Sequence, residues 1–283
     1  MSSKQTYTSL PFITYGEITT GNVSNQIYEV LSATAYDRRI YGIGITLNDG
    51  STHSQVRFYI NNGSANFQLN LNSVTASSGF STAQGVYDLF GASTISAYFR
   101  KQYDQIAVPY FNLPAGWSFG ASSFLTLGAG ENLGFWFTGE RYGAHNLNLT
   151  SNEFSQNVSF ANADGTSTKT LVSSSAYDRR VYAISVFSSD STARTLTLKL
   201  NDGVTSRIIG TISVTANAGN TTLISALDII AHANVYPILA KQYDMNGQPF
   251  FHLPTGWSIE GNFSVAVTAG TNIKFISNGE VYK

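Results

Sequence analysis

Apolar and polar residues alternate along much of the chain, a pattern typical of β-strands that bury one face. In residues 41–47 the apolar positions Tyr41, Ile43, Ile45 and Leu47 are separated by Gly, Gly and Thr. Asn-Gly and Asp-Gly pairs, which favour tight hairpin turns, separate several such segments. We therefore expect short antiparallel strands, each with one buried and one wet face.

The stretch that begins at Ser81 departs from this alternation of apolar and polar residues. Ser81 is followed three residues later by Gln84, which resembles a capping box at the start of a helix. The apolar residues that follow, up to residue 90, predict a short helix, and residues 221–230 would be its counterpart.

The chain contains an internal duplication. Four blocks return with an offset of 140 or 141 residues: Tyr-Asp-Arg-Arg at 36–39 and 177–180, Lys-Gln-Tyr-Asp at 101–104 and 241–244, Leu-Pro-x-Gly-Trp-Ser at 113–118 and 253–258, and Gly-Glu-x-Tyr at 139–142 and 279–282. A period of this length is typical of a whole domain. The sequence thus predicts an all-β protein with two tandem homologous domains, 15–142 and 153–283. Each is expected to be an antiparallel, jelly-roll-like β-sandwich with one short helix.

Residues 1–14 show no counterpart before the second repeat and are mostly polar, with isolated apolar side chains. We expect an N-terminal arm that is either disordered or lies on a partner. Residues 105–108 are a second difference, because their apolar tip replaces a turn at 245–248. The candidate partner contacts are Tyr7, Leu10, Phe12, Tyr15, Ile106 and Val108.

The composition excludes several classes of function. Lys plus Arg number 16 and Asp plus Glu 17, a net charge of −1, so nothing favours electrostatic binding of nucleic acid. The absence of cysteine excludes disulfides, iron–sulfur clusters and thiolate zinc sites. No apolar run approaches the roughly 18 residues of a membrane span, and the start does not read as a secretory signal.

The sequence also lacks the usual signatures of catalysis. The histidines are isolated, and neither a metal motif, a nucleophile elbow nor a phosphate loop occurs. We therefore predict no metal, no cofactor and no catalytic residue. A hydrolase that uses paired carboxylates, with Asp37 or Asp104, stays open.

The Tyr-Asp-Arg-Arg blocks are the best candidates for charged sites. Adjacent side chains on a strand point to opposite faces, so both arginines of a pair cannot line one pocket. Because the block stands in both copies, structural ion pairs are favoured over a ligand site. The predicted pairs join Arg38 or Arg39 to Asp104, and Arg179 or Arg180 to Asp244.

The tryptophans of the Leu-Pro-x-Gly-Trp blocks, Trp117 and Trp257, are predicted to pack on the core after a turn. If their indoles were exposed, they could instead stack against a sugar ring, together with Tyr103 and Tyr110.

Four features in this order carry a family resemblance: Thr-Leu-Thr-Leu-x-Leu-Asn-Asp-Gly at 195–203, the expected short helix, the Leu-Pro-x-Gly-Trp blocks, and Ala-Gly-Thr-Asn at 269–272. The chain resembles β-sandwich structural proteins of tailed bacteriophages, of the capsid auxiliary (decoration) or head-fibre type. The resemblance implies a non-enzymatic virion protein at the particle surface. Its partners would be the major capsid protein, other virion proteins or copies of itself. A carbohydrate-binding or receptor-binding module of a fibre or tail, with a glycan as ligand, is the alternative.

Overall fold

The computed structural model describes residues 6–49, 54–89, 91, 102–103, 108–124, 126–148, 151–239, 242–243 and 247–282. Their contacts divide them into two compact units. The first unit comprises 6–78 and 86–148, and the second comprises 151–282 together with the loop 79–85. Within these residues no helix is long and apolar enough to cross a membrane.

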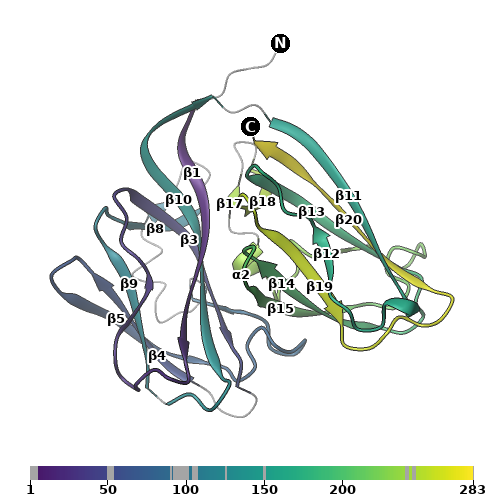
Figure 1. The fold of residues 1–283 in the computed structure, drawn as a ribbon, viewed down its shortest axis with the longest axis horizontal. Helices are drawn as coiled ribbons and strands as arrows, with labels where there is room; N and C mark the ends of the chain where they lie inside the picture. The colour runs from purple at the N-terminus through teal and green to yellow at the C-terminus, as the bar shows by residue number, and fades with distance from the viewer. Residues whose placement is uncertain are drawn as a thin grey trace. The chain divides into compact units, whose positions relative to one another are not determined.

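The first unit is built of strands that pair in a nested order (Figure 1). Its strands are β1 (Thr6–Thr19), β2 (Tyr28–Leu31), β3 (Asp37–Leu47), β4 (Ser54–Asn61), β5 (Asn66–Val74), β6 (Tyr87–Asp88), β7 (Gln102–Tyr103), β8 (Pro109–Leu113), β9 (Ser118–Ser123) and β10 (Asn132–Asn148). β1 pairs with β10, β2 with β9, β3 with β8, and β4 with β5, all antiparallel. The early half of the unit is therefore folded back on the late half.

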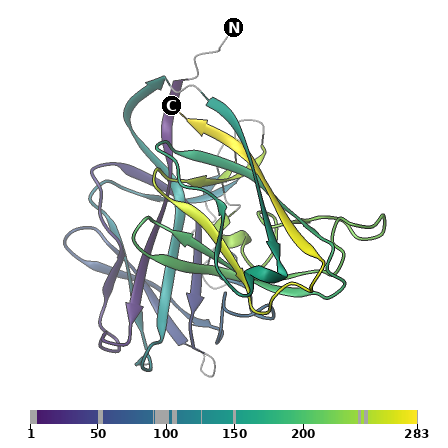
Figure 2. The same ribbon diagram turned by 45° about the vertical axis from the view of Figure 1, so that its right-hand side comes forward.

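The second unit repeats this order. Its elements are β11 (Ser151–Ala161), the 3-10 turn Asn162–Asp164, β12 (Lys169–Val172), β13 (Arg179–Ser188), β14 (Arg194–Asn201), β15 (Ser206–Val214), β16 (Leu227–Asp228), α2 (Tyr236–Leu239), β17 (Gln242–Tyr243), β18 (Pro249–Leu253), β19 (Ser258–Phe263) and β20 (Asn272–Tyr282). β11 lies beside β20 over its whole length, as the paired teal and yellow strands of Figure 2 show.

The sheet orders define two jelly rolls. In the first unit one sheet runs β1-β10-β3-β8-β7, with β6 added on β3, and the other runs β2-β9-β4-β5. The second unit has β11-β20-β13-β18-β17, with β16 added, and β12-β19-β14-β15. Two sheets of nested antiparallel pairs are the jelly-roll arrangement. The predicted fold class, two tandem jelly-roll-like sandwiches in an all-β chain, is confirmed.

Aromatic side chains fill the space between the sheets of the first unit. Phe119 is fully buried and contacts the rings of Phe111 and Phe137 at centroid distances of 5.8 and 5.7 Å. Phe58 meets Phe135 edge-on at 5.9 Å. Burying each such side chain stabilises the fold by about 1.5–3 kcal/mol.

The second core uses different positions for the same purpose. Phe160 of β11 contacts Phe263 and Phe275 at 5.0 and 5.5 Å. Phe160 pairs with Ile273 on β20, and in the first unit the equivalent of Ile273, Leu133, pairs with Ile18 of β1. Phe160 is therefore the counterpart of Ile18. An aromatic ring in one copy therefore occupies the place of an isoleucine in the other.

The face of β3 that the sequence pattern predicts to be solvent-exposed is buried. Every residue from Ile40 to Leu47 is buried, whereas β13 alternates between buried and half-buried positions. The face of the sheet opposite the core carries Tyr15 and Trp136, whose rings are tilted by 51° with their centroids 4.6 Å apart, and Trp136 is 1% exposed. A Cβ on Gly134 would lie 2.6 Å from the Thr46 hydroxyl, so this face is closely packed.

The structure also differs from the expected arm at residues 1–14. From Thr6 onward the chain is strand β1, which pairs with β10 from Thr6↔Asn148 to Thr19↔Asn132. β11 is its counterpart: Phe12 lies opposite Gly139 as Phe154 lies opposite Gly279. The offset here is 142 residues, and this shift hid the correspondence in the sequence.

The predicted helix after Ser81 is wrong. Gln84 N–H donates to the Ser81 hydroxyl at 3.1 Å, but residues 81–84 form bends and are followed by β6. Residues 221–230 likewise contain turns and β16, and the helix of the second repeat, α2, begins at Tyr236. The residues at the corresponding place in the first repeat, 96–99, lie outside the described part of the chain.

Candidate functional site

The repeated sequence blocks meet in space at the start of β3. The Asp37 carboxylate accepts a hydrogen bond from Ala115 N–H at 2.7 Å, and Gly116 N–H donates to the Thr34 carbonyl at 2.8 Å. The Asp37 block thus holds the Leu-Pro-x-Gly-Trp turn between β8 and β9.

The second repeat makes the same contacts. Asp178 accepts from Thr255 N–H at 2.7 Å, and Gly256 N–H donates to the Ser175 carbonyl at 2.8 Å. Asp178 also lies 3.7 Å from Nε2 of His252, which replaces Asn112 of the first repeat. Because these carboxylates are bound to main-chain N–H groups, their repetition is explained by loop structure.

In each repeat the Gly-Glu-x-Tyr block forms a second cluster with the second arginine of the Tyr-Asp-Arg-Arg block, which is Arg39 in the first repeat and Arg180 in the second. The Arg39 guanidinium lies over the rings of Tyr110 and Tyr142, at 4.7 and 4.2 Å. Tyr41 and Tyr142 both donate to one oxygen of Glu140, at 3.2 and 2.9 Å. Burial and then the neighbouring Glu140 raise the pKa of Tyr142, so its hydroxyl is a donor throughout the neutral range.

The equivalent cluster of the second unit has the same layout. Arg180 lies over Phe250 and Tyr282, at 4.6 and 4.7 Å, and Tyr182 donates to Glu280 at 3.1 Å. Tyr282 donates to the same carboxylate oxygen. Phe250 takes the place of Tyr110, so the cation–π contact with the arginine needs the aromatic ring and not the tyrosine hydroxyl.

A β-bulge shapes both clusters. The register between β3 and β10 shifts at Thr138/Gly139, and the register between β13 and β20 shifts at Val181/Ala183. The extra residue, Tyr41 in the first unit, turns its hydroxyl to Glu140 while Ile40 and Ile43 both join the core. The alternation in the sequence predicts Tyr41 on the face of Ile43, and the bulge is the reason that it lies elsewhere.

The two arginines of the first pair do point to opposite faces. Arg38 is 2% exposed and donates from Nη2 to the Trp117 carbonyl at 2.9 Å, whereas Arg39 lies on the tyrosine rings outside. Arg179 donates to the carbonyls of Ser173 and Ser174 and lies 4.9 Å from the Phe154 ring centroid. The predicted partners Asp104 and Asp244 lie outside the described residues, so these ion pairs stay predictions.

Each tryptophan ends a turn that is closed by a hydrogen bond from its main-chain N–H group. Trp117 N–H donates to Pro114 O at 3.1 Å and Trp257 N–H to Pro254 O at 3.0 Å. Gly116 and Gly256 have φ of 78° and 80°, a conformation that favours glycine. Both indoles are half-buried, and Trp117 packs against the first core.

The predicted partner contacts are distributed differently from expectation. Phe12 is buried in the first core and lies in strand β1 of the sheet, not in a free arm. The Tyr15 ring contacts that of Trp136, and its hydroxyl donates to Glu17. Val108 is half-buried, Ile106 lies outside the described residues, and Tyr7 and Leu10 lie in β1 with side chains outside that description.

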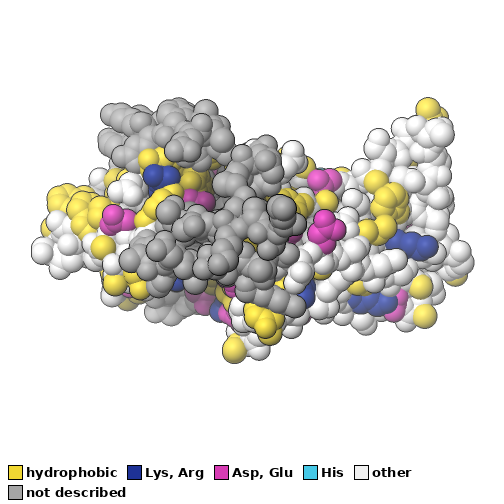
Figure 3. Space-filling model, turned by 90° about the horizontal axis from the view of Figure 1, so that it is seen from above, with side chains coloured by type: hydrophobic (Ala, Val, Ile, Leu, Met, Phe, Trp, Pro, Cys, Tyr) yellow, Lys and Arg dark blue, Asp and Glu magenta, His cyan; other side chains and the backbone are white. Residues whose placement is uncertain are grey.

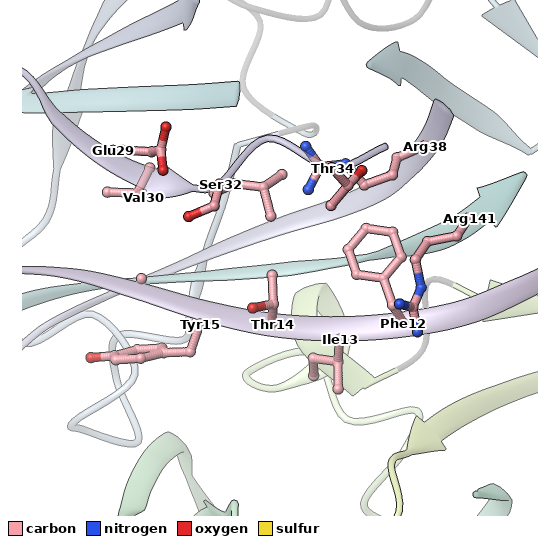
Figure 4. A pocket seen from close by; sticks show the side chains of 12 residues that line it. Phe12, Ile13, Thr14, Tyr15, Glu29, Val30, Ser32, Thr34, Arg38 and Arg141 are labelled. Atoms are coloured by element: carbon pink, nitrogen blue, oxygen red, sulfur yellow. The ribbon is translucent and has the colours of Figure 1, made fainter. Parts of the chain in front are cut away.

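A pocket of about 360 Å³ opens between β1 and β2 of the first unit (Figure 4). Phe12 and Thr14 point from β1 toward β2, and Glu29, Val30 and Ser32 line the opposite wall. Arg38 and Arg141 supply two positive charges at one end. The sequence does not predict this pocket, because one of its walls is β1, whose polar sequence is typical of a free arm.

Charge and metal-binding groups are sparse elsewhere. Within the described ranges no group of three or more His, Asp or Glu side chains could hold a metal ion. On the face shown in Figure 3 the charged side chains of the described residues lie singly or in small groups.

Comparison with known proteins gives fold-level neighbours only. No protein-family model matches the chain, and no curated protein matches it. Among solved structures, the major capsid protein P2 from bacteriophage PM2 is 9% identical, with 96% of this chain and 98% of that chain covered and a TM-score of 0.22. A triple jelly-roll structure from an archaeal virus is 12% identical, with 97% and 59% covered and a TM-score of 0.26. An infectious bursal disease virus Gt strain structure is 13% identical, with 100% and 73% covered and a TM-score of 0.22. Superpositions at these scores carry no argument, and the jelly-roll assignment rests on strand order.

Proposed function

We propose that this chain is a non-enzymatic structural protein of a virus particle, and that it binds the outer shell of a phage capsid as an auxiliary or decoration protein. The observation that carries the proposal is the pair of complete jelly rolls in one chain. Jelly rolls form the shells and surface proteins of many viruses, and they also occur in lectins.

The chemistry of the repeated blocks supports a structural role. Asp37 and Asp178 cap main-chain N–H groups, and Glu140 and Glu280 accept from tyrosines. Each of these carboxylates is therefore engaged in a contact that shapes its own unit. The low charged fraction, 12%, suits broad contacts repeated over a lattice, where multivalency strengthens weak individual bonds.

The test is mass spectrometry of density-gradient-purified particles from cells that carry this gene, with copy number measured against the major capsid protein. Many copies per particle support a shell protein, and a few copies indicate a tail or vertex. Absence from particles, together with a strictly monomeric state of the purified chain in light scattering, would contradict the proposal.

A carbohydrate-binding module is the second candidate, and one observation favours it. Tyr36 and Tyr177 occupy the same place in both repeats and are 39% and 45% exposed. Tyr110, by contrast, is covered by Arg39, and Trp117 packs on the core, so neither is an open sugar platform. Glycan-array binding that is lost in a Tyr36→Ala, Tyr177→Ala double variant, while the thermal midpoint is kept, would support this function.

A further inference from the structure

The pocket of the first unit lies between two sheet edges. Among the described residues β1 pairs only with β10, and β2 pairs only with β9, so each strand has one unpaired edge. The strands approach closely at Gly16, where an added Cβ would overlap the Val30 carbonyl. Near Phe12 the same two strands enclose the pocket (Figure 4).

The positive end of this pocket contains a buried arginine with few partners. Nη2 of Arg38 donates to Trp117 O, while Nε has no hydrogen-bond partner within the described structure. Burial lowers the pKa of Arg38, Glu29 opposes this shift and Arg141 adds to it, and together they leave the pKa at about 10. The guanidinium is still charged at neutral pH, and a buried charge with unmade hydrogen bonds is costly.

The second repeat gives the equivalent arginine different surroundings, although Nε of Arg179 likewise has no hydrogen-bond partner within the described structure. Arg179, the counterpart of Arg38, donates to two carbonyls of its own loop, Ser173 O at 2.6 Å and Ser174 O at 3.4 Å. The residue paired with Arg179 on β20 is Val281, whereas Arg38 is paired with Arg141. The place of Glu29 is taken by Thr170. At these matched positions the first repeat thus places a second cation beside the buried guanidinium, where the second repeat has a valine.

We propose that the pocket between β1 and β2 binds an extended peptide segment of another protein chain through an acidic side chain held by Arg38 and Arg141. Two cations against the single carboxylate of Glu29 leave a net positive charge that a carboxylate neutralises. The unpaired strand edges beside the opening supply main-chain donors and acceptors for an extended partner. Only the identity of the partner, a second virion chain, rests on the proposed function.

The primary test is calorimetric titration of the full chain with two blocked peptides at low ionic strength. One peptide is acetyl-Thr-Val-Glu-Val-Thr-amide and the other carries Gln in place of Glu. The Glu peptide is expected to bind about tenfold more tightly, because a charge-assisted pair replaces a neutral hydrogen bond. Equal affinity of the two peptides, or no binding of either, would overturn the proposal.

Three variants locate the effect. Arg141→Gln should abolish the preference for the Glu peptide, and Glu29→Gln should strengthen it. Arg57→Gln is the matched control, since Arg57 lies in the same unit but contacts Asn25 and Phe124 instead. An equal loss of preference in Arg57→Gln and Arg141→Gln would show a general charge effect and would contradict the site.

Propionate distinguishes a peptide site from a site for small carboxylates. If propionate binds Arg38 and Arg141 as tightly as the Glu peptide does, the strand edges contribute nothing and the peptide proposal fails. These titrations use the purified chain alone, so their failure leaves the particle-composition test of the proposed function unaffected.

Discussion

Asp190 is fully buried at the end of β13 and joins three parts of the second unit. It binds Arg194 at 2.7 Å and accepts from Thr192 and Thr268. Burial by itself raises the pKa of Asp190, but these hydrogen bonds outweigh it and hold the pKa well below 3.8. The contribution of Asp190 to stability is therefore complete above about pH 4. It is lost as the pH falls toward the lower, folded-state pKa.

Replacing this carboxylate tests that account. Asp190→Asn should lower the free energy of unfolding of the second unit by about 3 kcal/mol at pH 7, because the Arg194 charge loses its partner. The stability difference from the wild type should shrink between pH 4 and pH 2. Denaturant unfolding followed at several pH values measures both effects. Asp164→Asn, which removes an exposed ion pair with Lys169, should change stability little and is the control.

Gly139 marks the close approach of two strands at the bulge. A Cβ there would overlap the carbonyl oxygen of Arg39, and a Cβ on Gly279 would overlap that of Arg180. The glycine of the Gly-Glu-x-Tyr block is thus required because two strands approach closely there. The repeat in the sequence shows that this glycine recurs, and the structure shows why.

A matched pair of alanine substitutions checks this requirement. Gly139→Ala should destabilise the first unit by about 2 kcal/mol or more, since the strands must separate or lose the bulge. Gly21→Ala should be nearly neutral, because no atom lies within 4 Å of the added Cβ. Thermal unfolding of both variants gives the comparison. Similar midpoints for the two would refute the backbone-contact explanation.

At the level of elements, β1 decides whether the first jelly roll is complete. It supplies the buried side chains Phe12, Ile13 and Ile18 and closes one edge of the sheet through β10. An edge strand of this kind is structural, although its polar sequence resembles a free arm.

Truncation distinguishes a strand from an arm. A chain that begins at residue 15 should lose the cooperative unfolding of the first unit, because part of β10 loses its partner strand and the loss of Phe12 leaves a cavity in the core. Circular dichroism and proteolysis of the truncated chain measure the loss. An unchanged melting curve would restore the interpretation of residues 1–14 as an arm.

At the level of the whole molecule, the two repeats have the same topology but different surroundings for the same strands. The contacting pair Tyr15 and Trp136 corresponds by ladder position to Asn157 and Ile276 in the second repeat. The cores are likewise filled from different positions. Shared topology with divergent side chains is what a duplicated gene is expected to produce when only architecture is under constraint.

The second unit has its own nested strand pairs and its own core, which predicts that residues 151–283 fold when expressed alone. The fragment should show dispersed amide NMR signals and a single cooperative thermal transition. A fragment that remains unfolded would contradict the division of the chain into two domains at this boundary.

Much of the fold could be predicted from the sequence because the relevant signals are local. The alternation in residues 41–47 and the Asn-Gly and Asp-Gly turns identify strands and hairpins, and the four repeated blocks identify the doubling. The capping pattern at Ser81 failed because Tyr87 and Asp88 gain more by pairing with Ile45 and Gly44 of β3 than a short helix could offer.

The sequence by itself determined that this protein is all-β, doubled and built of jelly-roll-like sandwiches. Only the tertiary structure decided that β1 belongs to the sheet, that a bulge turns Tyr41 toward Glu140, and that Arg38 and Arg141 share a pocket. These features depend on pairings such as Thr6 with Asn148 and Arg38 with Arg141. Residues so far apart in the chain are paired only when the two halves of the jelly roll fold together, because these contacts are non-local.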